Sequence, residues 1–329
     1  TLLVLKEGVE VLLHQRKTNR KWTVNQKSKE ITSVALDKGF SPRRSARTKR
    51  ENAKSITGLA SYVFSTSSPT PRVDDGKHRV LSSLNSASLA AKTSDPESRL
   101  LSIWSAFEAL LPDPMKDGEG IVRIVHFSSL ISPCAVFDYL PVTFSECFRN
   151  CATAFGEPFL DVVSSLGKGE TEIEKFTSLF IADQEAKQSL CRTVSSSPLM
   201  LMRFHRLEKL LTNPKNACGY LETHERRVGW QIHRIYRERN GIVHKAAVSP
   251  FLGGLIENAY SYYRSVILSL ERVHSKYQIS HPDQGLEMAR VLYAEYKQGL
   301  QRISDRSGLP TSDRNTQFVQ SMFSDCLLS

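Results

Sequence analysis

An arginine, an asparagine and a histidine lie close together in a segment that otherwise has the pattern of an amphipathic helix. They are Arg239, Asn240 and His244, in the run RNGIVH at 239–244. Arginine carries a permanent positive charge and grips phosphate through a planar fork of donors. Histidine has an ordinary pKa near neutrality, so it can both accept and donate a proton. Together these residue types are a minimal set for cutting RNA without a metal ion.

The spacing of the motif limits how one chain can use it. Residues five apart lie about 140° apart around an ideal helix, so Arg239 and His244 do not share one stripe. They converge only if Gly241 loosens the helix, or if a second chain completes the site. The sequence therefore predicts half of a composite site, in which dimerisation is part of the mechanism.

Other basic residues of the same segment need to be distinguished from the motif. Arg237 precedes His244 by seven residues and satisfies a looser form of the pattern, but Arg239 is preferred because an asparagine follows it directly. Arg234 and Arg237 are candidates for a phosphate path, and the alternative is a solvated surface. Lys245 has the same two interpretations, contact with phosphate or plain exposure to solvent.

A glutamate in a second helix is the other candidate site residue. The run SDPE at 94–97 predicts a helix start, because Ser or Asp can cap and Pro is tolerated in the first turn. The helix that follows has apolar residues at spacings of three and four, and Glu108 lies in its middle. Glu108 is either a catalytic residue or the partner of a motif-helix arginine in a structural ion pair.

Apolar residues recur at helical spacing through most of the chain, which predicts an all-α domain over about 77–304. The segment 119–139 contains Pro133, where we expect a bend. Residues 305–329 are expected to be a polar, loosely held tail. The predicted helices are 78–92, 94–111, 119–139, 141–155, 170–182, 184–194, 198–211, 216–244, 253–278 and 284–304.

The N-terminal part has a different character. Short apolar runs at 2–5, 9–13 and 31–36 predict β-strands, and we expect residues 1–40 to be the end of an upstream β-containing domain. Residues 41–76 are basic and rich in Ser and Pro, as in a connector. The first methionine is Met115, so we expect the chain to be part of a longer protein or a processed form.

Charge is concentrated in the same N-terminal part. The formal net charge of the chain is +10, and residues 1–60 carry 14 lysines and arginines but only 5 acidic residues. A basic segment joined to a nearly neutral domain is consistent with a phosphate-bearing partner and equally with a solvated tail.

Three stretches together resemble a known family. They are RNGIVH at 239–244, similar to the family pattern RNxxVH; LLSIWSAFEAL at 100–110, similar to its lW.AlE.L helix; and LIENAYSYY at 255–263, similar to the helix after the motif. Over roughly 77–275 the chain resembles a HEPN domain, in particular the Apea-like branch found in bacterial defence proteins. The expected fold is an all-α, HEPN-like helical bundle with a basic N-terminal segment that contains short strands.

The resemblance implies a metal-independent endoribonuclease that needs no cofactor. The ribose 2′-OH attacks the adjacent phosphorus, and His244 serves as general base or acid. Arg239 stabilises the charge that develops on the phosphoryl oxygens, and Asn240 holds His244 or the phosphate. The products carry a 2′,3′-cyclic phosphate and a 5′-OH, so the substrate is RNA and not DNA.

The resemblance also implies a setting. Such enzymes act as homodimers with two motifs facing one cleft, here on tRNA or mRNA, as effectors of a bacterial defence or toxin system with an upstream sensor domain or partner protein. The alternative is a non-catalytic HEPN module that dimerises and binds RNA or protein.

Cysteine usage and hydropathy indicate the cellular compartment in which we expect the protein. The 6 cysteines are scattered, which suits a reducing compartment such as the cytoplasm, and Cys147 and Cys151 alone make a poor zinc site. No apolar run is evident that is long enough to span a bilayer, so no membrane partner is expected.

Overall fold

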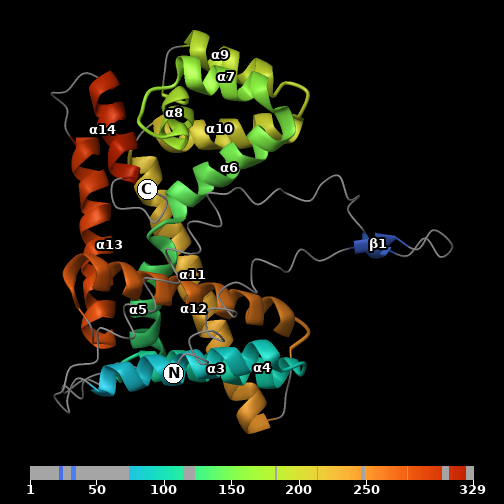
Figure 1. Ribbon diagram of the computed structural model, residues 1–329, viewed down its shortest axis with the longest axis vertical. Coiled ribbons are helices and arrows are strands. Elements are labelled where there is room, and N and C mark those ends of the chain that lie inside the picture. Colours follow the sequence, from blue (N-terminus) through green and yellow to red (C-terminus); the bar gives the residue numbers. More distant parts are fainter. Residues whose placement is uncertain are drawn as a thin grey trace. The chain divides into compact units, whose positions relative to one another are not determined.

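The fold is built almost entirely from helices (Figure 1). In the computed structural model the described residues from 74 onward form an all-α architecture, as the apolar spacing predicts. The described residues are 22–24, 31–34, 74–113, 123–181, 184–212, 214–245, 249–279, 281–305 and 311–323.

Two short strands precede the helices. β1 (Trp22–Val24) and β2 (Ile31–Val34) pair in antiparallel fashion, with Trp22 opposite Val34. The strand predicted at 31–36 coincides with β2. The hairpin predicted at 2–13 and most of the connector predicted at 41–76 lie outside the described residues.

The helices follow the predicted segments closely, and two were not predicted. The helix α7 was missed although Phe159 and Val163 are buried on it. It begins directly after Gly156, whose φ of 61° separates it from the helix before. The bounds are α3 (Asp74–Lys92), α4 (Pro96–Leu110), α5 (Arg123–Val136), α6 (Tyr139–Phe155), α7 (Glu157–Leu166), α8 (Glu172–Leu179), α9 (Gln184–Thr193), α10 (Pro198–Thr212), α11 (Pro214–Lys245), α12 (Leu252–Tyr277), α13 (Pro282–Asp305) and α14 (Thr311–Phe323).

The second missed helix, α14, corrects the prediction of a loose polar tail over 305–329. Phe318, Val319, Met322 and Phe323 are all buried. Their spacing of three and four places them on one inward stripe, which the polar residues around them conceal when only the average composition is considered.

The chain divides into two compact units, where the sequence suggested one helical domain over 77–304. The first unit contains residues up to Ile131 and then Trp230–Ala289, and the second contains Ser132–Gly229 and Arg290–Ser329. The chain passes between the units within α5, α11 and α13. All residues singled out as site candidates belong to the first unit.

The core of the first unit lies between α3, α4 and α12, which pack against one another (Figure 1). The rings of Phe107 and Tyr263 meet edge to face, with centroids 5.6 Å apart. The hydroxyl of Ser83 donates to the carbonyl of Ala106 at 2.7 Å and lies 2.9 Å from the Tyr263 hydroxyl. The buried phenol therefore has a polar partner, as a buried tyrosine requires.

Arg79 closes the C-terminal end of α4. Its Nε donates to the carbonyl of Ala109 at 3.1 Å and its Nη2 to that of Leu110 at 2.8 Å. Its guanidinium also pairs with Asp283, at 2.8 Å. The last carbonyls of a helix have no partner within it, so this arginine satisfies them and ties α3 to α4 and α13.

The core of the second unit is a cluster of phenylalanines. Their rings are contributed by α6, α7, α8 and α10 and by the residue that follows α8, with neighbouring centroids between 5.1 and 6.1 Å apart. Aromatic pairs at such separations add stability beyond the area they bury. The members are Phe144, Phe148, Phe159, Phe176, Phe180 and Phe204.

One stretch corrects the expectation that no apolar run could cross a membrane. Arg123–Phe155 is long and apolar enough to do so by length and composition, with a mean hydropathy of 1.2. Within its most apolar window 61% is buried inside the protein. Pro133 lies within α5, and α6 begins three residues after α5 ends. Burial against neighbouring helices accounts for the apolar composition, as in the core helices of soluble proteins.

Candidate active site

The residues singled out from the sequence lie on two helices of the first unit. Glu108 is on α4, two residues before the last residue of the helix. The other candidates lie on the last three turns of α11, where the helix continues without interruption through Gly241. They are Arg234, Arg237, Arg239, Asn240, His244 and Lys245.

The structure brings three of these residues together. Arg239 Nη2 lies 3.7 Å from Glu108 Oε1, and the two side chains are 27% and 22% exposed. Arg239 Nη1 donates to Asn240 Oδ1 at 3.0 Å. The ion pair that was one of the two interpretations of Glu108 is therefore present, and it joins the motif helix to α4.

The Glu108 carboxylate is held by further donors. Trp104 Nε1 donates to Oε1 at 3.0 Å, and Arg123 Nη1 lies 3.7 Å from the same oxygen. Arg123 Nε also lies 3.1 Å from Asp113. One carboxylate oxygen thus faces an indole N–H and two guanidinium groups, which fixes its position relative to Arg239.

Trp104 also positions the motif helix by packing. It is 1% exposed, and its ring lies 5.5 Å from that of Tyr236 on α11 and 6.2 Å from that of Phe127 on α5. Trp104 was not among the predicted site residues. Its position four residues before Glu108 was the available signal, because side chains at i and i+4 meet on one helix face.

His244 is separated from this cluster. Its side chain is exposed at the end of α11, and none of the described residues forms a hydrogen bond with it. Arg239 is partly buried against α4, and Ile242 is 9% exposed. Gly241 does not loosen the helix, so the first of the two ways in which Arg239 and His244 could converge is not found.

The residues that do share a face with His244 are Trp230, Arg234 and Arg237. They precede it by fourteen, ten and seven residues, and all are exposed, the indole by 67%. We call these four residues the outer face of α11. Lys245 is exposed beside it. Trp230 was not among the predicted site residues, although its helical spacing to the two arginines is visible in the sequence.

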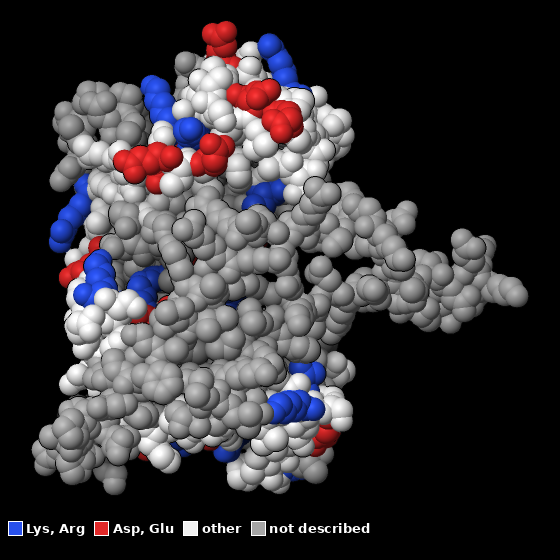
Figure 2. Space-filling model, in the orientation of Figure 1, with Lys and Arg blue, Asp and Glu red and all other residues white. Residues whose placement is uncertain are grey.

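The charge on the molecular surface is mixed. Figure 2 shows basic and acidic side chains interspersed over the described part of the visible face. Close to the motif, Glu238 Oε1 accepts a hydrogen bond from the Ser249 backbone N–H at 2.6 Å. This acid is therefore engaged with the segment that follows α11.

A histidine in the second unit has a perturbed environment. The ring of His224 stacks on Tyr139, with centroids 3.5 Å apart and an interplanar angle of 10°. Burial, and then the charge of Arg227, lower the pKa of His224 to about 4. Burial, and then a hydrogen bond with Tyr220, raise the pKa of Tyr139 to about 12. At neutral pH His224 is thus an uncharged stacking partner.

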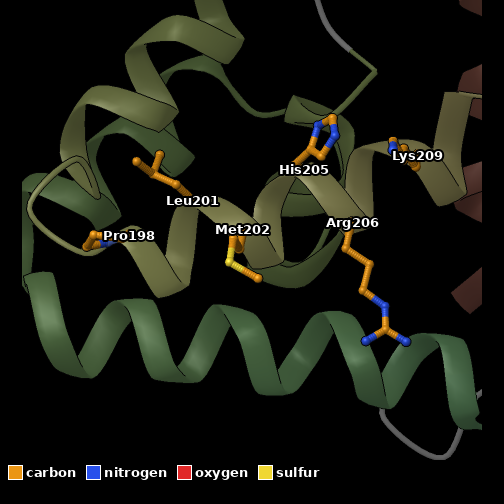
Figure 3. Close-up of a pocket in the computed structure, with 6 residues that line it drawn as sticks. All are labelled: Pro198, Leu201, Met202, His205, Arg206 and Lys209. Atoms are coloured by element: carbon orange, nitrogen blue, oxygen red, sulfur yellow. The ribbon is translucent and has the colours of Figure 1, made fainter.

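A shallow groove of about 600 Å³ also lies in the second unit, on α10. Figure 3 shows its lining side chains along that helix, with Met202 and Arg206 directed the same way. Arg206 Nη2 donates to the Tyr220 hydroxyl at 2.8 Å. None of the predicted site residues lies here. The lining residues are Pro198, Leu201, Met202, His205, Arg206 and Lys209.

Metal-ligating side chains do not gather within the described part of the chain. No group of three or more His, Cys, Asp or Glu residues there could hold a metal ion. The described cysteines, Cys147 and Cys151 included, are free thiols.

Comparison with protein families, with curated proteins and with solved structures finds no match for this chain. The resemblance to HEPN domains therefore stays a prediction from the residues quoted for it.

Proposed function

We propose that this chain is a metal-independent endoribonuclease of the HEPN type, in which Arg239 and His244 carry the reaction. The observation that supports this most is the contact between Glu108 and Arg239. It joins two of the stretches that carry the family resemblance, on α4 and α11.

In the proposed reaction His244 transfers protons and Arg239 stabilises negative charge. The 2′-oxygen of a ribose forms a bond to the adjacent phosphorus while His244 accepts its proton. The bond from phosphorus to the 5′-oxygen breaks, and that oxygen takes a proton from a protonated imidazole. The guanidinium of Arg239 stabilises the charge on the non-bridging oxygens. The products are a 2′,3′-cyclic phosphate and a 5′-OH.

Glu108 and Asn240 serve in positioning. The carboxylate of Glu108 restricts the Arg239 side chain, which lowers the cost of ordering it on the phosphate. The amide oxygen of Asn240 is occupied by Arg239, so its N–H₂ group is the part that remains to donate to phosphate.

The uninterrupted helix supports a composite site. Since Arg239 faces α4 and His244 faces outward, a second chain supplies the histidine that acts with a given arginine. We therefore propose that the active protein is a homodimer. We propose that it works in the cytoplasm as the effector of a bacterial defence or toxin system, regulated by an upstream domain or partner.

Cleavage assays with matched variants test the proposal. Purified protein is incubated with tRNA and total RNA in excess EDTA. Arg239→Ala and His244→Ala should each lower the rate by about 10² or more. His205→Ala changes another exposed histidine and should leave the rate unchanged. Cleavage that is equal in all four proteins contradicts the proposal.

Two observations favour a second candidate function. Arg239 already has a carboxylate partner, and the His244 ring is held by none of the described residues. Both fit a non-catalytic module that dimerises and binds RNA or protein. This candidate predicts that His244→Ala keeps full function, whereas substitutions of exposed basic residues weaken RNA binding with a marked salt dependence.

A further inference from the structure

An exposed tryptophan stands at one end of the outer face of α11. Trp230 is 67% exposed, whereas Trp104 of the same unit is 1% exposed. Tryptophan is highly buried on average, so an indole this exposed is unusual, and its neighbours decide whether the surface around it can bind a ligand.

Two arginines follow the indole at helical spacing. On an ideal helix Trp230, Arg234, Arg237 and His244 fall within a sector of about 80°, and the sector is about 21 Å long. Ile232 lies on the opposite, inner side and is 1% exposed. The four side chains therefore form a stripe that leads from the indole to the proposed catalytic histidine.

The charges of this stripe are available to a ligand. Within the described residues, Arg234 and Arg237 form no ion pair. The nearest acid of the same segment, Glu238, is partly buried and accepts the Ser249 N–H. The stripe thus offers two guanidinium groups and an aromatic ring without a competing carboxylate of its own.

This combination has a specific chemical complement. An aromatic ring stacks on a nucleic-acid base, and guanidinium groups bind phosphates along the backbone. Bases are accessible for stacking only where a strand is unpaired, whereas a duplex keeps them stacked on one another.

We propose that the outer face of α11 binds single-stranded RNA, with a base stacked on Trp230 and phosphates on Arg234 and Arg237, so that the strand runs toward His244. The inference rests on the proposed function for the fate of the bound RNA. Binding itself requires only the exposed ring and the two cations.

The test measures binding without cleavage. The full chain carrying His244→Ala is titrated into a labelled single-stranded RNA in EDTA. Adding Trp230→Ala should raise Kd by about 5- to 100-fold, and Trp230→Phe should retain most of the affinity. Arg237→Ala should raise Kd and reduce the slope of log K against log salt by about one. Tyr277→Ala, an exposed aromatic outside the stripe, should change nothing.

The outcomes separate this inference from the proposed function. Equal affinity of the Trp230→Ala and parent proteins overturns the inference, as does equally tight binding of an RNA duplex that is insensitive to Trp230. If Trp230 controls binding but the wild type cuts no RNA, the proposed function fails and the inference stands. If the wild type cuts RNA and Trp230 has no effect on binding, only the inference fails.

Discussion

The guanidinium of Arg239 lies 3.7 Å from the carboxylate of Glu108, and this contact joins the motif helix to α4. The same carboxylate oxygen accepts the indole N–H of Trp104. Removing one partner of a partly buried ion pair lowers the free energy of unfolding by more than the intact pair contributes to it. The reason is that the remaining charge is left buried without a partner. The contact is therefore the first place to test whether α4 positions the motif.

Glu108→Gln should separate the role of the charge from that of the hydrogen bond. The amide oxygen can still accept from Trp104, but it no longer attracts Arg239 or Arg123. We expect a loss of about 1 kcal/mol in the free energy of unfolding and roughly a tenfold drop in RNA cleavage. Chemical denaturation and the EDTA cleavage assay measure the two effects. Glu295→Gln, at an exposed position of α13, is the control. Equal stability and equal cleavage rates of the two variants would show that Glu108 does not position Arg239.

A mixture of two inactive variants should regain activity. In a dimer of one His244→Ala chain and one Arg239→Ala chain, one composite site keeps an arginine and a histidine, and the other site has neither. Random mixing should therefore restore about a quarter of the wild-type rate. The measurement is the cleavage rate after the two proteins are unfolded and refolded together. No recovery, with dimers demonstrably mixed, would place both residues of a working site in one chain.

Two glycines of α13 should respond to alanine with opposite signs. A Cβ at Gly285 would lie 2.7 Å from Cδ2 of Leu270, which is 1% exposed and must repack. Gly285→Ala should lower the free energy of unfolding by about 1 kcal/mol. A Cβ at Gly299 meets nothing within 4 Å, so Gly299→Ala should raise it by about 0.5–1 kcal/mol through helix propensity. Urea denaturation of the two variants checks the signs, and a stabilising Gly285→Ala would show that the packing against Leu270 is looser than described.

The environment of His224 should make the stability of the protein depend on pH. Its pKa in the folded protein is lowered from 6.5 to about 4, so between these values the unfolded chain holds a proton that the folded chain does not. The contribution of the uncharged His224 to the free energy of unfolding is therefore complete above pH 6.5 and is lost as the pH falls toward 4. With allowance for solvent, the loss is about 1–2 kcal/mol. Unfolding measured at pH 7.5 and 4.5 should show a smaller decrease for His224→Gln than for the wild type, and His205→Gln, at an exposed histidine, should match the wild type. A decrease that His224→Gln leaves unchanged would assign the pH dependence to other groups.

The helices were predictable because their inner faces repeat at three and four residues, as on α12, where Leu255, Ile256 and Tyr263 are buried as that spacing requires. The helix α14 was not predicted because its four buried residues are few among polar neighbours. The division into two units was not predicted either, because long helices such as α11 pass from one unit to the other without a break in periodicity.

The site was predictable in its residue types and only partly in its arrangement. The 140° offset between Arg239 and His244 follows from helix geometry alone, and it places them as the structure does, one inward and one outward. The contact of Arg239 with Glu108 could only be offered as one of two interpretations. The part played by Arg123 depends on how α5 packs against α4, and no local pattern encodes such packing.

The chemistry of the RNA ends produced in excess EDTA shows whether Arg239 and His244 cut RNA through the ribose 2′-OH. We expect fragments with a 2′,3′-cyclic phosphate and a 5′-OH from the wild type, and no such fragments from His244→Ala. Wild-type protein that cuts no RNA under activating conditions, or that leaves 5′-phosphates, would contradict this expectation.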